Sequence, residues 1–189
     1  MPWVSTPEYD FVRGCFDEGF GEDHGVQVTH RRSVVFAKPR YFLVVDQVAG
    51  EGRHDLLWHF LFASLSLSCT GDGRALTSEA DAANVCMHWS DTELSSEIVV
   101  DEQEYPWRGC QTCHGEDRPA ASLLLRRRVE LPATVAFLIE PLPPGASPGL
   151  ALDSLSVAER IVCTVSDGGG SHSVMLPSGD GKEVAVLHG

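Results

Sequence analysis

Two cysteines and a histidine form the most compact chemical motif in the sequence. Cys110, Cys113 and His114 have the C-x-x-C-H spacing with which two thiols bond the vinyl groups of haem c while the histidine binds the iron. Haem attachment requires export, and the motif normally begins a helix, whereas strand-like segments flank it here. We therefore favour a structural turn and no haem, with a redox-active or metal-binding cysteine pair as the alternative.

Two histidines and an aspartate on consecutive predicted strands could lie on one face of a sheet. If residues 37–40 form the loop of a tight hairpin, His30 or Arg31 falls opposite Asp46. If residues 49–54 form the loop of the next hairpin, His59 lies diagonal to Asp46. A His/Asp/His set is a zinc ligand set. Because a register slip of one residue reverses every face, we favour an ordinary cross-strand contact of Asp46 and no metal.

The basic residues gather in two strand-like stretches. Arg31 and Arg32 lie in the first, and Arg126 and Arg128 share one face of the second. Their planar guanidinium groups suit the carboxylates of an acidic glycan, so a groove that binds uronate or sulfate groups is one interpretation. The favoured one is protection of sheet edges and scattered pairing with the 27 acidic residues.

Trp107 is the aromatic residue best placed to stack on a sugar ring. It follows Tyr105 and a proline in a segment predicted to be a loop, where its side chain would be exposed. Trp58 and Trp89 lie within predicted strands and are expected in the core instead.

The candidate residues described above must be positioned by predicted β-strands. These segments have the length of strands, are rich in β-branched and apolar residues, and are separated by Gly, Pro, Asp and Ser. They cover residues 26–36, 41–48, 56–67, 85–89, 94–100, 122–130, 133–140, 160–165, 173–176 and 183–187. Short turn-rich loops join the first three, which predicts an antiparallel meander. A short helix is considered only at residues 78–83 or 155–160, and neither has a sustained helical period.

Many short strands at even spacing predict an all-β protein, an antiparallel β-sandwich. The chain of 189 residues is long enough for one domain with its own core, so we expect a single domain over residues 1–189. The Pro-rich segment 141–148 cannot supply the backbone hydrogen bonds of a central strand and is predicted to be a connecting loop.

Composition and charge exclude several classes of function. A net charge of −13 argues against nucleic acid as a partner, because phosphate binding needs an electropositive face. No apolar run approaches the roughly 20 residues that span a bilayer, and the N-terminus has no recognisable secretion signal. The six cysteines could be buried free thiols or disulfides, so the compartment stays open.

One long stretch resembles a known family. Residues 17–21 read DEGFG, residues 30–46 read HRRSVVFAKPRYFLVVD, and Gly-Arg-His follows at residues 52–54. This succession is similar to the heparinase II/III-like polysaccharide lyases, and a weaker similarity continues through Arg-Gly at residues 108–109 and His-Gly-Glu at residues 114–116. Together the two parts cover about two thirds of the chain.

The resemblance implies a fold and a chemistry. These lyases join a catalytic α/α toroid to a C-terminal super-sandwich of β-strands, are typically periplasmic, bound to the cell envelope or secreted, and cleave uronic-acid polysaccharides, such as glycosaminoglycans or alginate, by β-elimination. Their upstream His-x-His-x-Asp, Asp-Pro-Gly and His-Asn-Thr motifs do not occur here. We therefore expect the β-sandwich part of such a lyase, inactive alone, with no catalytic residue of its own.

The resemblance also implies an acidic polysaccharide as the partner. Two origins stay open: the chain is a fragment of a larger lyase, from a split or truncated gene, or it is a subunit that packs against a separate catalytic toroid chain. Two other hypotheses stay open. One is a stand-alone carbohydrate-binding module that uses Trp107 and the arginines, and the other is a c-type haem protein that uses Cys110, Cys113 and His114.

Overall fold

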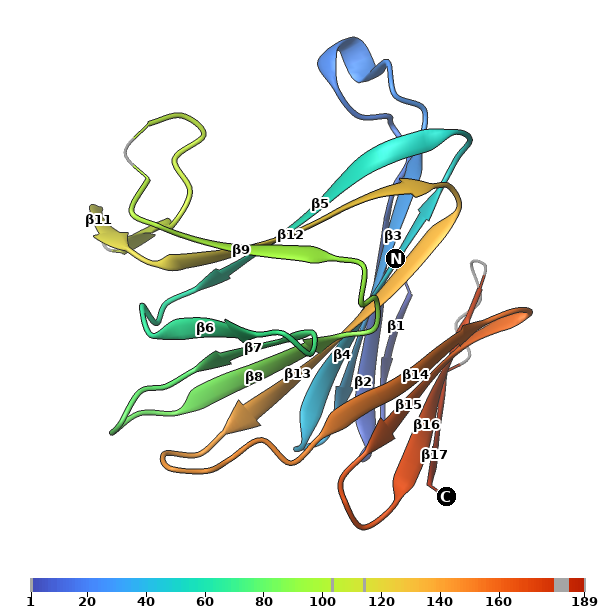
Figure 1. Cartoon of the computed structure of the whole chain (residues 1–189). Helices are drawn as coiled ribbons and strands as arrows, with labels where there is room; N and C mark the ends of the chain where they lie inside the picture. Colours follow the sequence, from blue (N-terminus) through green and yellow to red (C-terminus); the bar gives the residue numbers. More distant parts are fainter. Residues whose placement is uncertain (1, 103, 114, 179–183, 189) are drawn as a thin grey trace.

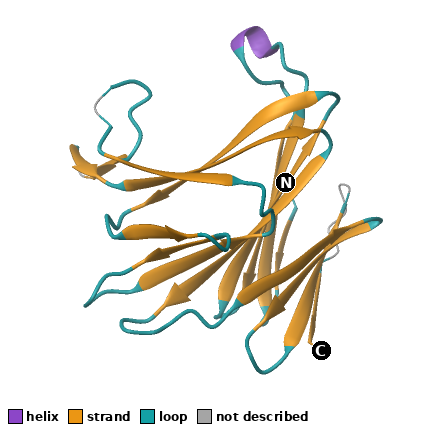
Figure 2. Ribbon diagram, in the orientation of Figure 1, coloured by secondary structure: helices purple, strands orange, loops and turns teal. Residues whose placement is uncertain are grey.

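The computed structural model describes residues 2–102, 104–113, 115–178 and 184–188. Nearly all of its regular structure is antiparallel β-strand (Figures 1 and 2). The predicted all-β class is confirmed, and the strands form three layers, because a large central sheet lies between two smaller ones.

The central sheet has eight strands. In spatial order they are β1 (Trp3–Ser5), β2 (Tyr9–Phe16), β3 (Thr29–Ala37), β4 (Tyr41–Ala49), β13 (Ala133–Leu142), β8 (Asn84–Trp89), β7 (Arg74–Thr77) and β6 (Leu67–Thr70). The chain thus builds one half of the sheet from its N-terminal hairpins. It then inserts β13, from far along the sequence, between β4 and β8.

Two smaller sheets cover the two faces of the central one. A three-stranded sheet has the order β5 (Arg53–Phe62), β12 (Ala121–Glu130), β9 (Ser95–Val100), and a four-stranded sheet has the order β14 (Ala151–Val157), β15 (Arg160–Ser166), β16 (Ser171–Pro177), β17 (Ala185–His188). A separate hairpin, β10 (Cys110–Cys113) and β11 (Glu116–Pro119), extends beyond the end of the three-stranded sheet (Figure 1).

Two hydrophobic cores explain why the central strands are apolar on both faces. In β4, Leu43 and Val45 pack toward the four-stranded sheet, whereas Val44 packs toward the three-stranded sheet. Successive strand residues point to opposite faces, so a strand covered on both sides becomes a continuous apolar run. The sequence Tyr-Phe-Leu-Val-Val at the start of β4 follows from this double burial.

The β3–β4 hairpin forms as predicted, with a register that differs by one residue. Ala37, expected in the loop, pairs with Tyr41 at the end of the ladder, and its burial in the core extends the strand. Asp46 consequently faces Arg32, whereas His30 or Arg31 was expected opposite it. His30 is two residues away from Arg32 and therefore stays on the same face.

The predicted three-stranded meander is wrong. β5 does not pair with β4 but crosses to the three-stranded sheet, where it pairs along its whole length with β12. β13 occupies the place beside β4 instead. The strand expected at residues 56–67 is also split, since β5 ends at Phe62 and β6 begins at Leu67. Between them Ser64 and Ser66 donate hydrogen bonds to the carboxylate of Glu79.

Neither helix candidate forms a helix. Residues 78–83 are irregular, and residues 155–160 are divided between β14 and β15, since Leu155 pairs with Cys163 in the four-stranded sheet. The helical turn in the described part of the chain is η1 (Glu22–His24). No helix in that part of the chain has the length and apolarity needed to cross a membrane.

The Pro-rich segment begins as strand and ends as loop. β13 continues through Pro141 to Leu142, both paired with β8. The pairing of β13 with β4 stops at Ile139, so Pro141 lies where the strand has one partner, and proline is tolerated at such positions. The connecting loop therefore starts two residues later than predicted.

Candidate functional site

A cleft of about 360 Å³ opens between the β3–β4 hairpin of the central sheet and β5. Three groups of residues form its walls: Phe20, Val26 and Val28 from the segment before β3, His30, Arg32 and Val48 from the β3–β4 hairpin, and Leu56, Trp58 and His59 among those from β5. The mouth is partly apolar, because Phe20 and Val26 are both exposed. Its walls combine apolar side chains with histidines and an arginine, a combination that is usual in binding sites.

Asp46 organises the polar side of this cleft. Its side chain is fully buried, and it accepts hydrogen bonds from Nε of Arg32 (2.8 Å), from a terminal nitrogen of Arg32 (2.7 Å) and from Nε2 of His30 (3.0 Å). Burial raises the pKa of Asp46, but the hydrogen bonds from Arg32 and His30 outweigh it and hold the pKa below its usual value. The carboxylate therefore stays charged and fixes the side chains of Arg32 and His30.

Arg32 is held in place but not covered. Its guanidinium lies 5.9 Å from the centre of the Phe60 ring, and 42% of its side chain remains exposed. The hydrogen bond to Asp46 raises the pKa of Arg32. A fixed, partly exposed guanidinium in an apolar cleft can bind the carboxylate or sulfate of a ligand, because its outer N–H groups remain available.

The structure brings together two of the three predicted zinc ligands. His30 and Asp46 are in contact, whereas His59 lies on the outer face of β5 and its Nε2 is within 2.7 Å of the hydroxyl of Ser122. Trp58, its neighbour in the strand, points inward to the core. His59 is absent from the Asp46 cluster because β5 belongs to a different sheet.

Arg31 and Arg32 do not form one basic surface. They are consecutive residues of β3 and therefore point to opposite faces of the central sheet. In the ladder Arg31 lies between Cys15 of β2 and Gln47 of β4, away from the cleft.

Arg126 and Arg128 lie on β12 of the three-stranded sheet. Arg126 is 3.7 Å from Glu97 and Arg128 is 3.9 Å from Asp55, and all four side chains are at least half exposed. Exposed pairs of this kind contribute little to stability. The five residues predicted to bind substrate are thus spread over separate surfaces, and of these only Arg32 lines the cleft.

Trp107 is exposed, as predicted. It leaves 64% of its surface accessible and packs edge-on against Tyr105, which is 80% exposed, with ring centres 5.2 Å apart. Both residues lie in the loop between β9 and β10. The adjoining groove is acidic, with Glu102 and Asp117 in its walls.

The C-x-x-C-H motif falls on the β10–β11 hairpin. Cys110 opens β10 and donates a weak hydrogen bond from Sγ to Asp101 at 3.6 Å. Cys113 ends the same strand, and His114 lies outside the described residues. The favoured structural turn and the alternative of haem attachment both stay untested, and a Soret band in protein from cells competent in attachment would support the alternative.

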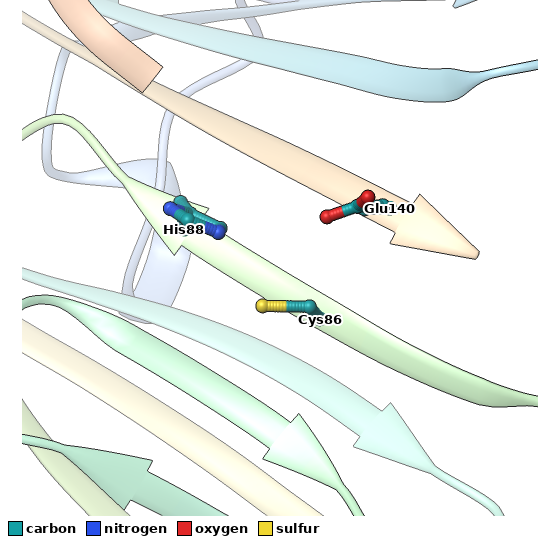
Figure 3. Close-up of side chains that lie close together, drawn as sticks. All are labelled: Cys86, His88 and Glu140. Atoms are coloured by element: carbon teal, nitrogen blue, oxygen red, sulfur yellow. The ribbon is translucent and has the colours of Figure 1, made fainter. Parts of the chain in front are cut away.

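Sequence reasoning missed a second group of ligand-type side chains. Cys86 and His88 on β8 and Glu140 on β13 are all buried, with their ligand atoms within 4.8 Å of one another (Figure 3). The Cys-x-His spacing within a strand, which places both side chains on one face, was the only signal available. The glutamate comes from a strand more than fifty residues away in the sequence.

The central sheet and the two smaller sheets on its faces define an antiparallel β-sandwich domain. The model of the family described as "Heparinase II/III-like, C-terminal" matches residues 11–137, and the chain belongs to this family. The match includes the β3–β4 hairpin, Asp46 and β5. No curated protein matches the chain significantly.

Solved structures of lyases share the fold. A variant of a heparan sulfate lyase from Pedobacter heparinus superposes with a TM-score of 0.70 at 16% identity, covering 95% of this chain and 28% of that one. A structure described as heparinase III gives 0.71 at 15% identity, covering 93% of this chain and 27% of that one. The chain therefore spans little more than a quarter of the length of these proteins, and the likeness concerns the fold.

Proposed function

We propose that this chain is the β-sandwich portion of a polysaccharide lyase that acts on uronic-acid polysaccharides by β-elimination, and that an α/α toroid outside these 189 residues supplies the catalytic half. The family match supports the class. The observation that carries the proposal within this chain is Arg32, fixed by Asp46 yet partly exposed in the cleft.

The chemistry explains why a second component is needed. β-Elimination requires a base for the proton α to the uronate carboxyl, an acid for the leaving oxygen, and a cation or hydrogen-bond donors for the charge that develops on the carboxyl. Arg32 suits the last of these requirements. His30 already contacts Asp46, and we assign no residue of this chain to proton transfer.

An apolar rim beside the cleft provides a surface for the toroid. Phe20, Val26 and Leu57 line the cleft and are each between about two fifths and one half exposed, and they come from the segment before β3 and from β5. Exposed apolar residues that gather around a cleft mark contact surfaces more often than isolated ones do. A toroid seated there would close the cleft over Arg32.

A reconstitution experiment tests this proposal. The chain would be assayed alone and together with an α/α-toroid polypeptide, by following the absorbance of unsaturated uronate with heparan sulfate, hyaluronan and alginate. We expect no cleavage by the chain alone and cleavage by the pair. Arg32→Lys should lower kcat/KM of the pair by about 10-fold or more, because lysine keeps the charge but loses the bidentate geometry.

Arg128→Lys is the matched control, since Arg128 is an exposed arginine outside the cleft, and it should leave the rate unchanged. Cleavage by the purified chain alone would overturn the assignment of catalysis to a second component. Equal effects of the two substitutions would overturn the role of Arg32.

A second candidate function rests on the exposed aromatic pair. Tyr105 and Trp107 could stack on sugar rings in a carbohydrate-binding module that needs no catalytic partner. Glu102 and Asp117 beside them would disfavour acidic glycans, so neutral and acidic oligosaccharides should both be titrated. Saturable binding that Trp107→Ala weakens and Arg32→Lys leaves unchanged would favour this candidate, and a flat titration would exclude it.

A further inference from the structure

Cys86, His88 and Glu140 form a compact group on the opposite face of the central sheet from the cleft. Cys86 and His88 are two residues apart in β8, and Glu140 of β13 pairs directly with Cys86. Paired residues in an antiparallel ladder share a face, so the three side chains converge (Figure 3). Leu138, which pairs with His88, belongs to the core under the four-stranded sheet.

The group is buried and incompletely satisfied. Cys86 is 0%, His88 5% and Glu140 8% exposed. Nε2 of His88 is inaccessible and has no hydrogen-bond partner among the described residues. A buried imidazole nitrogen without a partner is unusual in native proteins and calls for a ligand or a water at that position.

Glu140 is oriented by the backbone of the following loop. Its carboxylate accepts hydrogen bonds from the amide of Gly149 at 3.0 Å and from the amide of Leu150 at 3.2 Å. These amides are neutral, so they fix the direction of the carboxylate without cancelling its charge. Each carboxylate oxygen keeps a lone pair for a further partner, and fixing a ligand through outer hydrogen bonds is usual at metal sites.

The three donor types suit one kind of ion. Thiolate, imidazole and carboxylate together favour zinc among the biologically common divalent ions, since calcium and magnesium prefer oxygen alone. A Zn²⁺ ion bound by one thiolate and one carboxylate would make the buried site electrically neutral. Ligand atoms within 4.8 Å of one another need small side-chain adjustments to reach a tetrahedral set with a water as the fourth ligand.

We propose that Cys86, His88 and Glu140 bind a zinc ion that ties β8 to β13 in the central sheet. The site is separate from the cleft and from the His30–Asp46 contact. Arg74 pairs with His88 from the neighbouring strand and is 3.2 Å from Asp72, and both are partly exposed. Partly exposed side chains therefore lie one strand away from the site.

The protonation states of the free side chains agree with this chemistry. Burial lowers the pKa of His88, with a smaller effect in the same direction from Arg74, so the imidazole is neutral and ready to bind. Burial, assisted by Glu140, raises the pKa of Cys86 to about 11, so the thiol must release a proton when the ion binds. Zinc uptake should therefore weaken as the solution is acidified.

Cobalt substitution of the whole chain tests the proposal. Chelator-treated protein would be titrated with Co²⁺ and then with Zn²⁺. We expect one equivalent of cobalt with a thiolate charge-transfer band, displaced by zinc, and a zinc-dependent rise in Tm. Cys86→Ala should abolish the band, and His88→Ala should weaken zinc binding by about 100-fold or more, since the loss of even an outer partner costs roughly 10- to 100-fold.

Two control variants test three of the other five thiols. Cys163→Ala alters a buried cysteine of the four-stranded sheet, and the double variant Cys110→Ala/Cys113→Ala removes the C-x-x-C pair. Both should keep the band. Absence of a thiolate band in the unmodified chain would overturn the proposal without recourse to any variant, and so would a band that survives in folded Cys86→Ala protein.

Discussion

Arg32 and Asp46 face each other across β3 and β4, and the guanidinium of Arg32 binds both carboxylate oxygens of Asp46. The aspartate is buried, whereas the arginine reaches the cleft. Because one partner is buried and the other is exposed, the pair can have both a structural role and a binding role. Asp46 anchors the hairpin, and Arg32 presents a fixed cation to whatever enters the cleft.

Removing the side chain of Arg32 should lower the free energy of unfolding by more than is usual for a partly exposed arginine. Arg32→Ala leaves the buried Asp46 carboxylate with His30 as its remaining side-chain partner, and we expect a loss of about 2–3 kcal/mol in the free energy of unfolding. Urea denaturation followed by circular dichroism measures it. Arg128→Ala, which breaks an exposed pair, should cost no more than about 0.5 kcal/mol. Equal losses would contradict the anchoring role of Asp46.

The same pair predicts how stability depends on acid. Despite its burial, Asp46 has a pKa below its ordinary value of 3.8 because of the hydrogen bonds from Arg32 and His30. The unfolded chain therefore takes up a proton at a higher pH than the folded chain does, and the stabilisation present above about pH 4 is lost as the pH falls through the lower value. The stability difference between the native chain and Asp46→Asn should shrink below about pH 4. A difference that stays constant would contradict this.

The hydroxyl of Tyr41 should titrate at a higher pH than an ordinary tyrosine. It lies between the central and four-stranded sheets, its hydroxyl is 2.6 Å from Nε2 of His172, and burial raises its pKa to about 12. The unfolded chain loses this proton first, near pH 10, so stability contributed by Tyr41 declines as the pH rises toward 12. Ultraviolet titration of tyrosinate should show one late step that Tyr41→Phe lacks. The same late step in that variant would refute the assignment.

Phe137 should be essential for the contact between the central and three-stranded sheets. It is fully buried, and its ring centre lies 4.9 Å from that of Phe60 and 6.1 Å from that of Trp58, both on β5. Phe137→Ala should therefore lower the free energy of unfolding by about 3–5 kcal/mol. Leu57→Ala, on the half-exposed outer side of β5, should lower it by less than about 1 kcal/mol. Similar losses would indicate that β5 does not pack through Phe60 and Trp58.

Prediction from the sequence succeeded where a strand is long and strongly apolar. β4 and β12 were located within one residue, because alternation and continuous apolar runs are local signals. β2 was missed, since Arg13 and Gly14 interrupt its pattern; in the structure Arg13 is buried and donates to Ser33. The short strands β6 and β7 have four residues each and too little sequence to show a period.

The amino-acid sequence by itself determined the all-β class, the presence of the β3–β4 hairpin and the family motif around Asp46. The tertiary structure alone decided that Arg32 is its partner, that His59 belongs to another sheet, and that Glu140 meets Cys86. The physical reason is that the patterns used for prediction are local in the sequence, whereas the contacts between strands are not. Alternation along a strand fixes which of its own residues share a face, whereas strand neighbours and register are chosen by packing between segments far apart in the chain.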